Sequence, residues 1–216
     1  MRILSGMETH GAIGLRDRKK QETRERLAHV ATLLFIERGF ENVTIAEVAE
    51  AADVSKMTVT NYFPRKEDLV FDAHEGVEDS LAKVLRDRRP GESALRALHR
   101  EFVGSLDANR PLNGLCTADF AQLVHSSERL RARERELDEK REAALADALA
   151  AEPRGDDPAP VLVAAQLAAA HRVLVNKGRA LIRDHTGPET VRAALTALAD
   201  SAFSLLEPAL GDSYTR

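Results

Sequence analysis

Apolar residues recur at intervals of three and four along almost the whole chain, and no segment shows the alternation of apolar and polar residues that is typical of a strand. The pattern therefore predicts an all-α protein. A first helix is predicted over 19–38, ended by Gly39. Its apolar stripe consists of Leu27, Val30, Ala31, Leu34 and Phe35. We expect this helix to be the scaffold for the elements that follow.

Two short helices come next, predicted over 45–52 and 56–63. Thr44 and Glu47, three residues apart, form a capping box at the start of the first. Pro64 ends the second, because proline has no N–H to donate and disfavours a helical conformation in the residue before it. Helices of this length are marginal by themselves in water, so neighbouring structure must hold them at a fixed angle.

The second short helix has one apolar and one polar face. Ser55 is its expected N-cap, and Val59 and Phe63, four residues apart, can both point into a core. The side chains left facing outward are Lys56, Met57, Thr60 and Asn61. This is the layout of a helix-turn-helix recognition helix, whose residues reach base edges in the major groove. The pattern alone fits an ordinary helical hairpin with a solvated polar face just as well.

A further set of residues decides between these interpretations. The set comprises residues 39–40, 44–49, 54–55, 58–59, 61–64 and 66–69. In residue types and spacing it resembles the N-terminal DNA-binding domain of the TetR (tetracycline repressor) family, over the first third of the chain. The resemblance implies a sequence-specific transcriptional repressor that binds an inverted-repeat operator as a homodimer and is released by a small-molecule ligand. The family usually has an aromatic residue, most often Tyr, at the position of Thr60, so the operator preferences of other members do not carry over.

The same resemblance gives roles to individual residues. Lys56, Met57 and Thr60 would face base edges, where a lysine suits guanine acceptors and methyl groups suit the thymine methyl. The residues assigned to phosphates are Thr44, Thr58, Tyr62 and Lys66, and Asn61 would contact a base or a phosphate. The complete set of predicted DNA-binding residues is Arg18, Lys19, Thr44, Ser55, Lys56, Met57, Thr58, Thr60, Asn61, Tyr62 and Lys66.

Charge adds a constraint on any DNA contact. The chain has 216 residues and a formal net charge of -4, so a local basic patch must supply the attraction to DNA. Residues 16–20, Arg-Asp-Arg-Lys-Lys, form such a cluster, and residues 1–15 have no periodicity and are predicted to be a disordered N-terminal arm. The cluster would lie on the phosphate backbone or, in the simpler interpretation, only keep the protein in solution.

After Pro64 the periodicity continues to be helical. Further helices are predicted over 66–88, 92–108, 115–126, 128–151, 158–185 and 188–206, with loops at 110–114 and 153–158. The first of these is long enough to connect two domains. We therefore predict a three-helix DNA-binding domain over 16–66 and a helical ligand-binding and dimerisation domain over 67–210.

The last two predicted helices are the most apolar part of the chain. A pair of this kind can pack on its own domain and against a second copy, which gives a four-helix bundle across a two-fold axis. A dimer also suits DNA binding, because one recognition helix covers too few base pairs to select a site in a genome, and two of them occupy an inverted repeat.

The resemblance further implies an unidentified small-molecule effector bound among the C-terminal helices. The candidate ligand-binding residues are polar or aromatic groups in apolar surroundings: His99, Phe102, Cys116, Phe120, His125, His171, Asn176 and Arg179. Each of them also fits the role of an ordinary core residue. Arg179, if it points inward, would favour an anionic ligand such as a carboxylate.

Other classes of protein find no support in the sequence. It has no glycine-rich phosphate loop, no catalytic triad signature and no metal-binding spacing, so no enzyme activity and no cofactor are expected. It has one cysteine, no run of about 18 apolar residues and no apolar leader, which predicts a cytoplasmic protein without a membrane span.

Two alternatives stay open at this stage. One is a ligand-sensing or partner-binding helical protein that contacts DNA weakly and without sequence preference. The other is a transcriptional activator, which differs from a repressor only in where its operator lies relative to a promoter.

Overall fold

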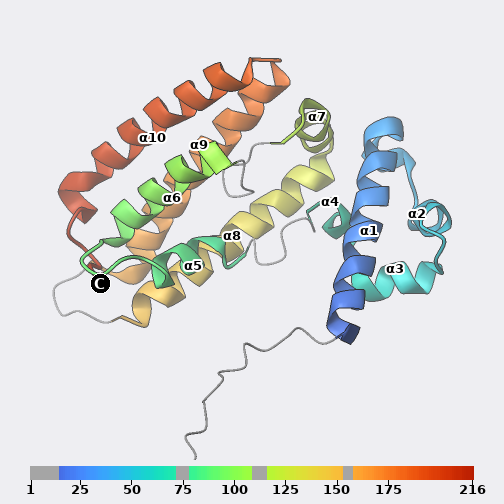
Figure 1. The fold of residues 1–216 in the computed structure, drawn as a ribbon, viewed down its shortest axis with the longest axis horizontal. Helices are drawn as coiled ribbons and strands as arrows, with labels where there is room; N and C mark the ends of the chain where they lie inside the picture. Colours follow the sequence, from blue (N-terminus) through green and yellow to red (C-terminus); the bar gives the residue numbers. More distant parts are fainter. Residues whose placement is uncertain (1–14, 72–77, 109–115, 153–157) are drawn as a thin grey trace, which may run out of the picture. The chain divides into compact units, whose positions relative to one another are not determined.

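The computed structural model describes residues 15–71, 78–108, 116–152 and 158–216 (Figure 1). The chain divides into two compact units, 1–73 and 74–216. Every regular element in the described ranges is a helix, which confirms the predicted all-α class. The first unit contains α1 (Leu15–Arg38), the 3-10 turn η1 (Phe40–Asn42), α2 (Ile45–Ala51), α3 (Lys56–Tyr62) and α4 (Asp68–Phe71).

A small apolar core holds the first unit together. α1 packs against η1, α2 and α4, and α2 packs against α3. The rings of Phe35 and Phe40 meet edge to face, with centroids 5.1 Å apart. The fully or almost fully buried side chains are Leu27, Ala31, Phe35, Phe40, Val43, Val48, Val59, Phe63 and Leu69. Gly39 allows the sharp turn between α1 and η1, because its φ of +85° is a conformation that favours glycine.

α1 begins at Leu15, four residues before the predicted start. The basic cluster 16–20 is therefore the first part of a helix rather than a segment that precedes it. Arginine and lysine are good helix formers, and Arg18 pairs with Glu22 one turn later, at 3.5 Å. Residues 1–14, predicted to be a disordered arm, lie outside the described residues.

The second unit is a bundle of longer helices. They are α5 (Ser80–Arg86), α6 (Ala94–Ala108), α7 (Ala118–Ser126), α8 (Glu128–Ala150), α9 (Pro160–Arg183) and α10 (Pro188–Leu210). α9 packs against α7, α8 and α10, and α10 also packs against α6 (Figure 1). Among the helices described, α10 has the length and apolar content that could also cross a membrane, by composition only.

Three predicted helix boundaries were wrong in this unit. The helix expected over 66–88 is not continuous, because residues 78 and 79 form a turn and α5 begins after Asp79. The Asp79 carboxylate makes no cap hydrogen bond and pairs with the Arg86 guanidinium instead. α7 begins three residues late, with Thr117 as N-cap, so Cys116 precedes it. α10 continues past the predicted end through Pro208 to Leu210.

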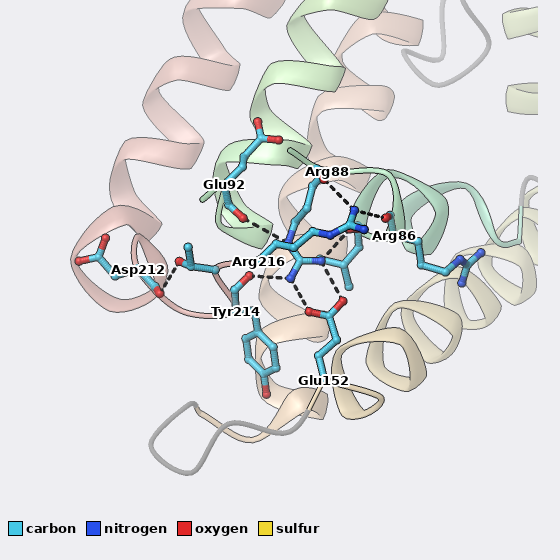
Figure 2. A network of polar contacts seen from close by, with 9 residues as sticks. Arg86, Arg88, Glu92, Glu152, Asp212, Tyr214 and Arg216 are labelled. Atoms are coloured by element: carbon cyan, nitrogen blue, oxygen red, sulfur yellow. Dashed lines mark hydrogen bonds and ion pairs between the residues drawn. The ribbon is translucent and has the colours of Figure 1, made fainter. Parts of the chain in front are cut away.

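Arg88 is the centre of a buried polar network (Figure 2). Its side chain is 0% exposed, and its guanidinium donates to both carboxylate oxygens of Glu152, at 3.0 and 2.5 Å. It also donates to the backbone carbonyls of Leu85 at 2.7 Å, Glu92 at 3.2 Å and Tyr214 at 3.0 Å. One side chain thus ties the end of α5, the start of α6, the end of α8 and the C-terminal segment together.

The segment after α10 is part of this network. Tyr214 is buried, and its hydroxyl donates to the carbonyl of Pro158 at 2.6 Å. The guanidinium of Arg216 donates to the carbonyls of Arg86 and Arg88 at 2.8 and 2.9 Å (Figure 2). Residues 211–216 therefore fasten the loop between α5 and α6.

We predict that Arg88→Met destabilises the protein by about 3–5 kcal/mol, because it removes a donor from the Glu152 carboxylate, from the buried carbonyls of Leu85 and Tyr214 and from the partly buried carbonyl of Glu92. Urea unfolding of the full chain measures the effect. Arg96→Ala is the matched control: Arg96 pairs with Glu207 at 2.8 Å, but both side chains are about half exposed, so the loss should be much smaller than that of Arg88→Met. Equal losses of unfolding free energy in the two variants would show that the contacts of Arg88 do not stabilise the protein more than an exposed ion pair does.

Candidate nucleic-acid interface and effector pocket

The turn between α2 and α3 is fixed by caps at both helix starts. The Thr44 hydroxyl accepts from the Glu47 N–H at 3.3 Å, and the Thr44 N–H donates to the Glu47 carboxylate at 2.8 Å, which confirms the capping box. Between the helices, Asp53 takes a left-handed φ of 52°. The Ser55 hydroxyl then accepts from the Thr58 N–H at 3.0 Å, so Ser55 is the predicted N-cap of α3.

Glu47 joins α2 to the end of α1. Its carboxylate contacts the Arg38 guanidinium at 2.5 Å in addition to Thr44. The hydrogen bond from the Thr44 backbone, followed by those from the side chains of Arg38 and Thr44, lowers the pKa of Glu47 from 4.5 to about 2. The carboxylate is thus held in its charged form at neutral pH, and three elements of the first unit meet at this side chain.

α3 has the two faces that its sequence predicts. Val59 lies in the core with 0% exposure, and Phe63, directly after the helix, is 1% exposed. Lys56, Met57, Thr60 and Asn61 are all exposed, and together we call them the recognition face. Met57 is 70% exposed, a large value for an apolar side chain on a well-packed unit.

Two hydroxyl groups on α3 are already engaged within the chain. The Thr60 hydroxyl donates back to the carbonyls of Lys56 and Met57, at 3.3 and 3.1 Å. The Thr58 hydroxyl lies 2.8 Å from that of Ser55. The Thr58 hydroxyl thus joins the N-cap of α3, and the donor of the Thr60 hydroxyl is occupied by the backbone of the helix.

Lys66 packs against the core of the first unit. Its ammonium group donates to the carbonyl of Phe40 and lies over the ring of Phe40, 4.2 Å from the centroid. It also lies 5.3 Å from the ring centroid of Phe35. These contacts stabilise the core of the unit. An ammonium group has three N–H donors, so the assignment of Lys66 to a DNA phosphate stays a prediction.

The other predicted phosphate contacts lie nearer the surface. Tyr62 and Thr58 are half-buried, and Thr44 is exposed at the start of α2. Arg18 and Lys19 are exposed in the first turns of α1. An unpredicted cation, Arg24, lies over the ring of Phe63, 5.0 Å from its centroid, and so braces the end of α3.

A small apolar cavity lies in the second unit among α5, α6, α9 and α10, and as the candidate ligand site it is named the effector pocket. It is lined by Leu81, Val84, Leu98, Glu101, Phe102, Leu167, His171 and Phe203. Two of the predicted ligand-binding residues, Phe102 and His171, meet here, with their rings edge to face and centroids 6.1 Å apart. A third, His99, stacks on Phe203 at 5.0 Å and contacts Asp200 at 2.8 Å, so it braces one wall.

The remaining candidates are not part of this pocket. His125 and Asn176 are exposed, and Phe120 is half-buried on α7. Cys116 and Arg179 lie near each other; burial raises the pKa of the Cys116 thiol although the Arg179 guanidinium opposes the change. Arg179 lies against Glu134 of α8, and two nitrogens of its guanidinium are buried without a hydrogen-bond partner. Its role as a contact to an anionic ligand stays a prediction.

Sequence reasoning missed most of the pocket lining. Leu81, Leu167 and Phe203 are ordinary core residues by pattern, and they converge only because α5, α9 and α10 pack together. Glu101 is the one acidic group on the lining. In the sequence, Glu101 is an acidic residue directly before Phe102 on an amphipathic helix. This pattern occurs on solvent-exposed helix faces as well as in pockets, so it does not by itself predict a pocket.

Comparison with known proteins finds similarity to bacterial transcriptional regulators. Residues 27–73 match the family described as bacterial regulatory proteins, tetR family. Over 220 residues, 98% of this chain and 95% of the relative, the chain is 27% identical to the HTH-type transcriptional regulator TcmR of Streptomyces glaucescens. Over 64 residues, 30% of this chain and 31% of the relative, it is 38% identical to the HTH-type transcriptional regulator LuxR of Vibrio harveyi.

Solved structures share the fold. NalD of Pseudomonas aeruginosa, the secondary repressor of the MexAB-OprM multidrug efflux pump, matches with a TM-score of 0.54 and 18% identity, over 85% of this chain and 96% of that one. A TetR-family regulator of Streptomyces coelicolor matches with a TM-score of 0.51 and 23% identity, over 87% and 99% of the two chains.

We predict that the stabilising effect of Glu47 depends on pH. Because its pKa is lower in the folded protein than its ordinary 4.5, its contribution is complete above about pH 4.5 and is lost as the pH falls toward 2. Glu47→Gln should therefore lower the melting temperature at pH 7, and the gap to wild type should close between pH 4.5 and 2. Glu50→Gln, exposed on the same helix, is the control. A gap that stays constant over this range would contradict the assignment.

Proposed function

Because this chain is a member of the TetR family of DNA-binding transcriptional regulators, we propose that it represses transcription by binding an inverted-repeat operator as a homodimer. A small-molecule effector releases it from DNA. The observation that carries the proposal is the exposed recognition face of α3. The helix is capped at its start and packed on its inner side, and the recognition face on its other side is exposed. The protein acts as a regulator in the cytoplasm and not as an enzyme.

In this proposal α3 enters the major groove and presents the recognition face to base edges. Lys56 donates to guanine acceptors, and Asn61 contacts a base or a phosphate at the edge of the face. Arg18 and Lys19 on α1, with Thr44, Ser55, Thr58 and Tyr62 around the turn, form the contacts to phosphates that fix the register. Lys66, whose ammonium group also donates to the carbonyl of Phe40, stays among the proposed phosphate contacts.

The surface of α9 and α10 supports the homodimer. Val161, Leu162 and Val173 on α9 are 66%, 61% and 54% exposed, and Leu205 on α10 is 81% exposed. Only 22% of the most apolar 18-residue stretch of α10 is buried within the chain. A second copy that covers this surface would complete a four-helix bundle and place two recognition helices on a two-fold axis, as an inverted repeat requires.

The effector pocket supports release by a small molecule. Its wall is apolar except for Glu101 and His171, and it is built from α5, α6, α9 and α10. Ligand-binding sites are commonly apolar cavities with a few polar groups that orient the ligand. A ligand that binds one arrangement of these helices more tightly than another shifts the dimer toward a spacing of recognition helices that no longer fits the operator.

The recognition face makes a direct prediction. In a random duplex library at about 150 mM salt, where contacts to the DNA backbone are weakened, wild type should enrich one inverted repeat. Lys56→Ala combined with Thr60→Ala should enrich none and still form the dimer, because neither residue lies in α9 or α10. Selection of the same repeat by the double variant would show that other residues contact the bases.

The exposed apolar surface of α9 and α10 gives a second prediction. Val173→Glu combined with Leu205→Glu should sediment at the mass of one chain and bind the inverted repeat about 100-fold or more weakly, because the two half-sites are no longer linked. Leu33→Glu replaces an exposed leucine of α1, 55% exposed, and should leave the mass of the dimer unchanged. An intact dimer in the double variant would place the interface elsewhere.

A further inference from the structure

The donor of the Thr60 hydroxyl group is occupied within the helix, so this hydroxyl can only accept a hydrogen bond from DNA. It donates to the carbonyls of Lys56 and Met57, at 3.3 and 3.1 Å, on the helix's own backbone. Threonine has a stiff first side-chain torsion, and this back-bonding selects one of its two helical rotamers. With the hydroxyl turned toward the backbone, the methyl group is the part of the side chain that extends from an exposed position.

Met57 extends the same apolar surface. It lies three residues before Thr60, which places both side chains on one face of the helix. The Met57 side chain is 70% exposed and carries no hydrogen-bond donor. The centre of the recognition face is therefore apolar, and the polar groups of Lys56 and Asn61 lie beside it.

The largest apolar group that the major groove offers to such a surface is the 5-methyl group of thymine. The nitrogen and oxygen atoms on the base edges are donors or acceptors, and covering them with methyl groups removes their water without returning a hydrogen bond. On the basis of the proposed function, we propose that Thr60 and Met57 determine specificity by selecting thymine through its methyl group, at one or two fixed positions in each half-site.

The experiment compares two random duplex libraries, one made with thymine and one with uracil, which differs only in lacking this methyl group. One round of binding at about 150 mM salt is followed by sequencing of the bound fraction. Wild type should enrich thymine at the proposed positions in the first library. In the second library, enrichment at each of these positions should fall roughly fourfold, the factor for burying one methyl group. Positions contacted by Lys56 should not change.

Two variants separate the methyl group from the hydroxyl group. Thr60→Val keeps a methyl group and removes the hydroxyl, and it should keep the preference for thymine over uracil. Thr60→Ser keeps the hydroxyl and its bond to the backbone, and it should lose that preference at one position. Lys56→Ala is the control, because it should lose enrichment of guanine and keep the difference between thymine and uracil.

Each other outcome contradicts the proposal in a distinct way. The same motif with equal enrichment in both libraries would show specific binding without methyl recognition, so the inference fails and the proposed function stands. A preference for thymine that survives in Thr60→Ser and is lost in Thr60→Val would assign recognition to the hydroxyl group. No enriched sequence in either library would overturn the proposed function together with the inference.

Discussion

The seven residues of α3 form too few backbone hydrogen bonds to persist as a helix by themselves, and the position of α3 depends on side chains outside its exposed face. Ser55 caps its start, Val59 and Phe63 bury its inner face, and Arg24 covers the ring of Phe63. Upstream, Glu47 binds both Thr44 and Arg38, so that α2 is fixed to the end of α1. The recognition face can be left exposed because the contacts beneath it hold α3 in place.

This arrangement explains how a molecule with a net charge of -4 can bind a polyanion. The attraction must come from a local group of cations and not from the whole molecule. In the first unit Lys66 donates to a carbonyl and lies over two aromatic rings, and Arg38 pairs with Glu47. The exposed cations include Arg18 and Lys19 at the start of α1 and Lys56 on α3. These three are among the cations that we propose to contact DNA.

Local signals in the sequence predicted the first unit well. Capping residues act within three or four positions of where they stand, so Thr44, Glu47 and Ser55 gave the starts of α2 and α3 directly. Contacts between distant residues could not be predicted in this way. Lys66 has the sequence context of a phosphate-binding residue, and only the packing of η1 and α1 brings Phe40 and Phe35 beneath its ammonium group. Arg88 joins Glu152 and Tyr214, which lie far along the chain, and nothing near Arg88 indicates either partner. The effector pocket likewise exists only where α5, α6, α9 and α10 converge.

We propose that the recognition face selects a DNA sequence. It does more than strengthen the attraction of the protein to the phosphate backbone of any DNA. The most direct measurement is the ratio of two dissociation constants for the wild-type protein at about 150 mM salt, one for the enriched inverted repeat and one for a duplex of the same length and composition with its order scrambled. Specific regulators prefer their sites by roughly 1,000-fold or more under such conditions. A ratio of this size would support a sequence-specific regulator. A ratio near one, with both constants rising steeply as salt is added, would show that only phosphates are bound and would contradict the account.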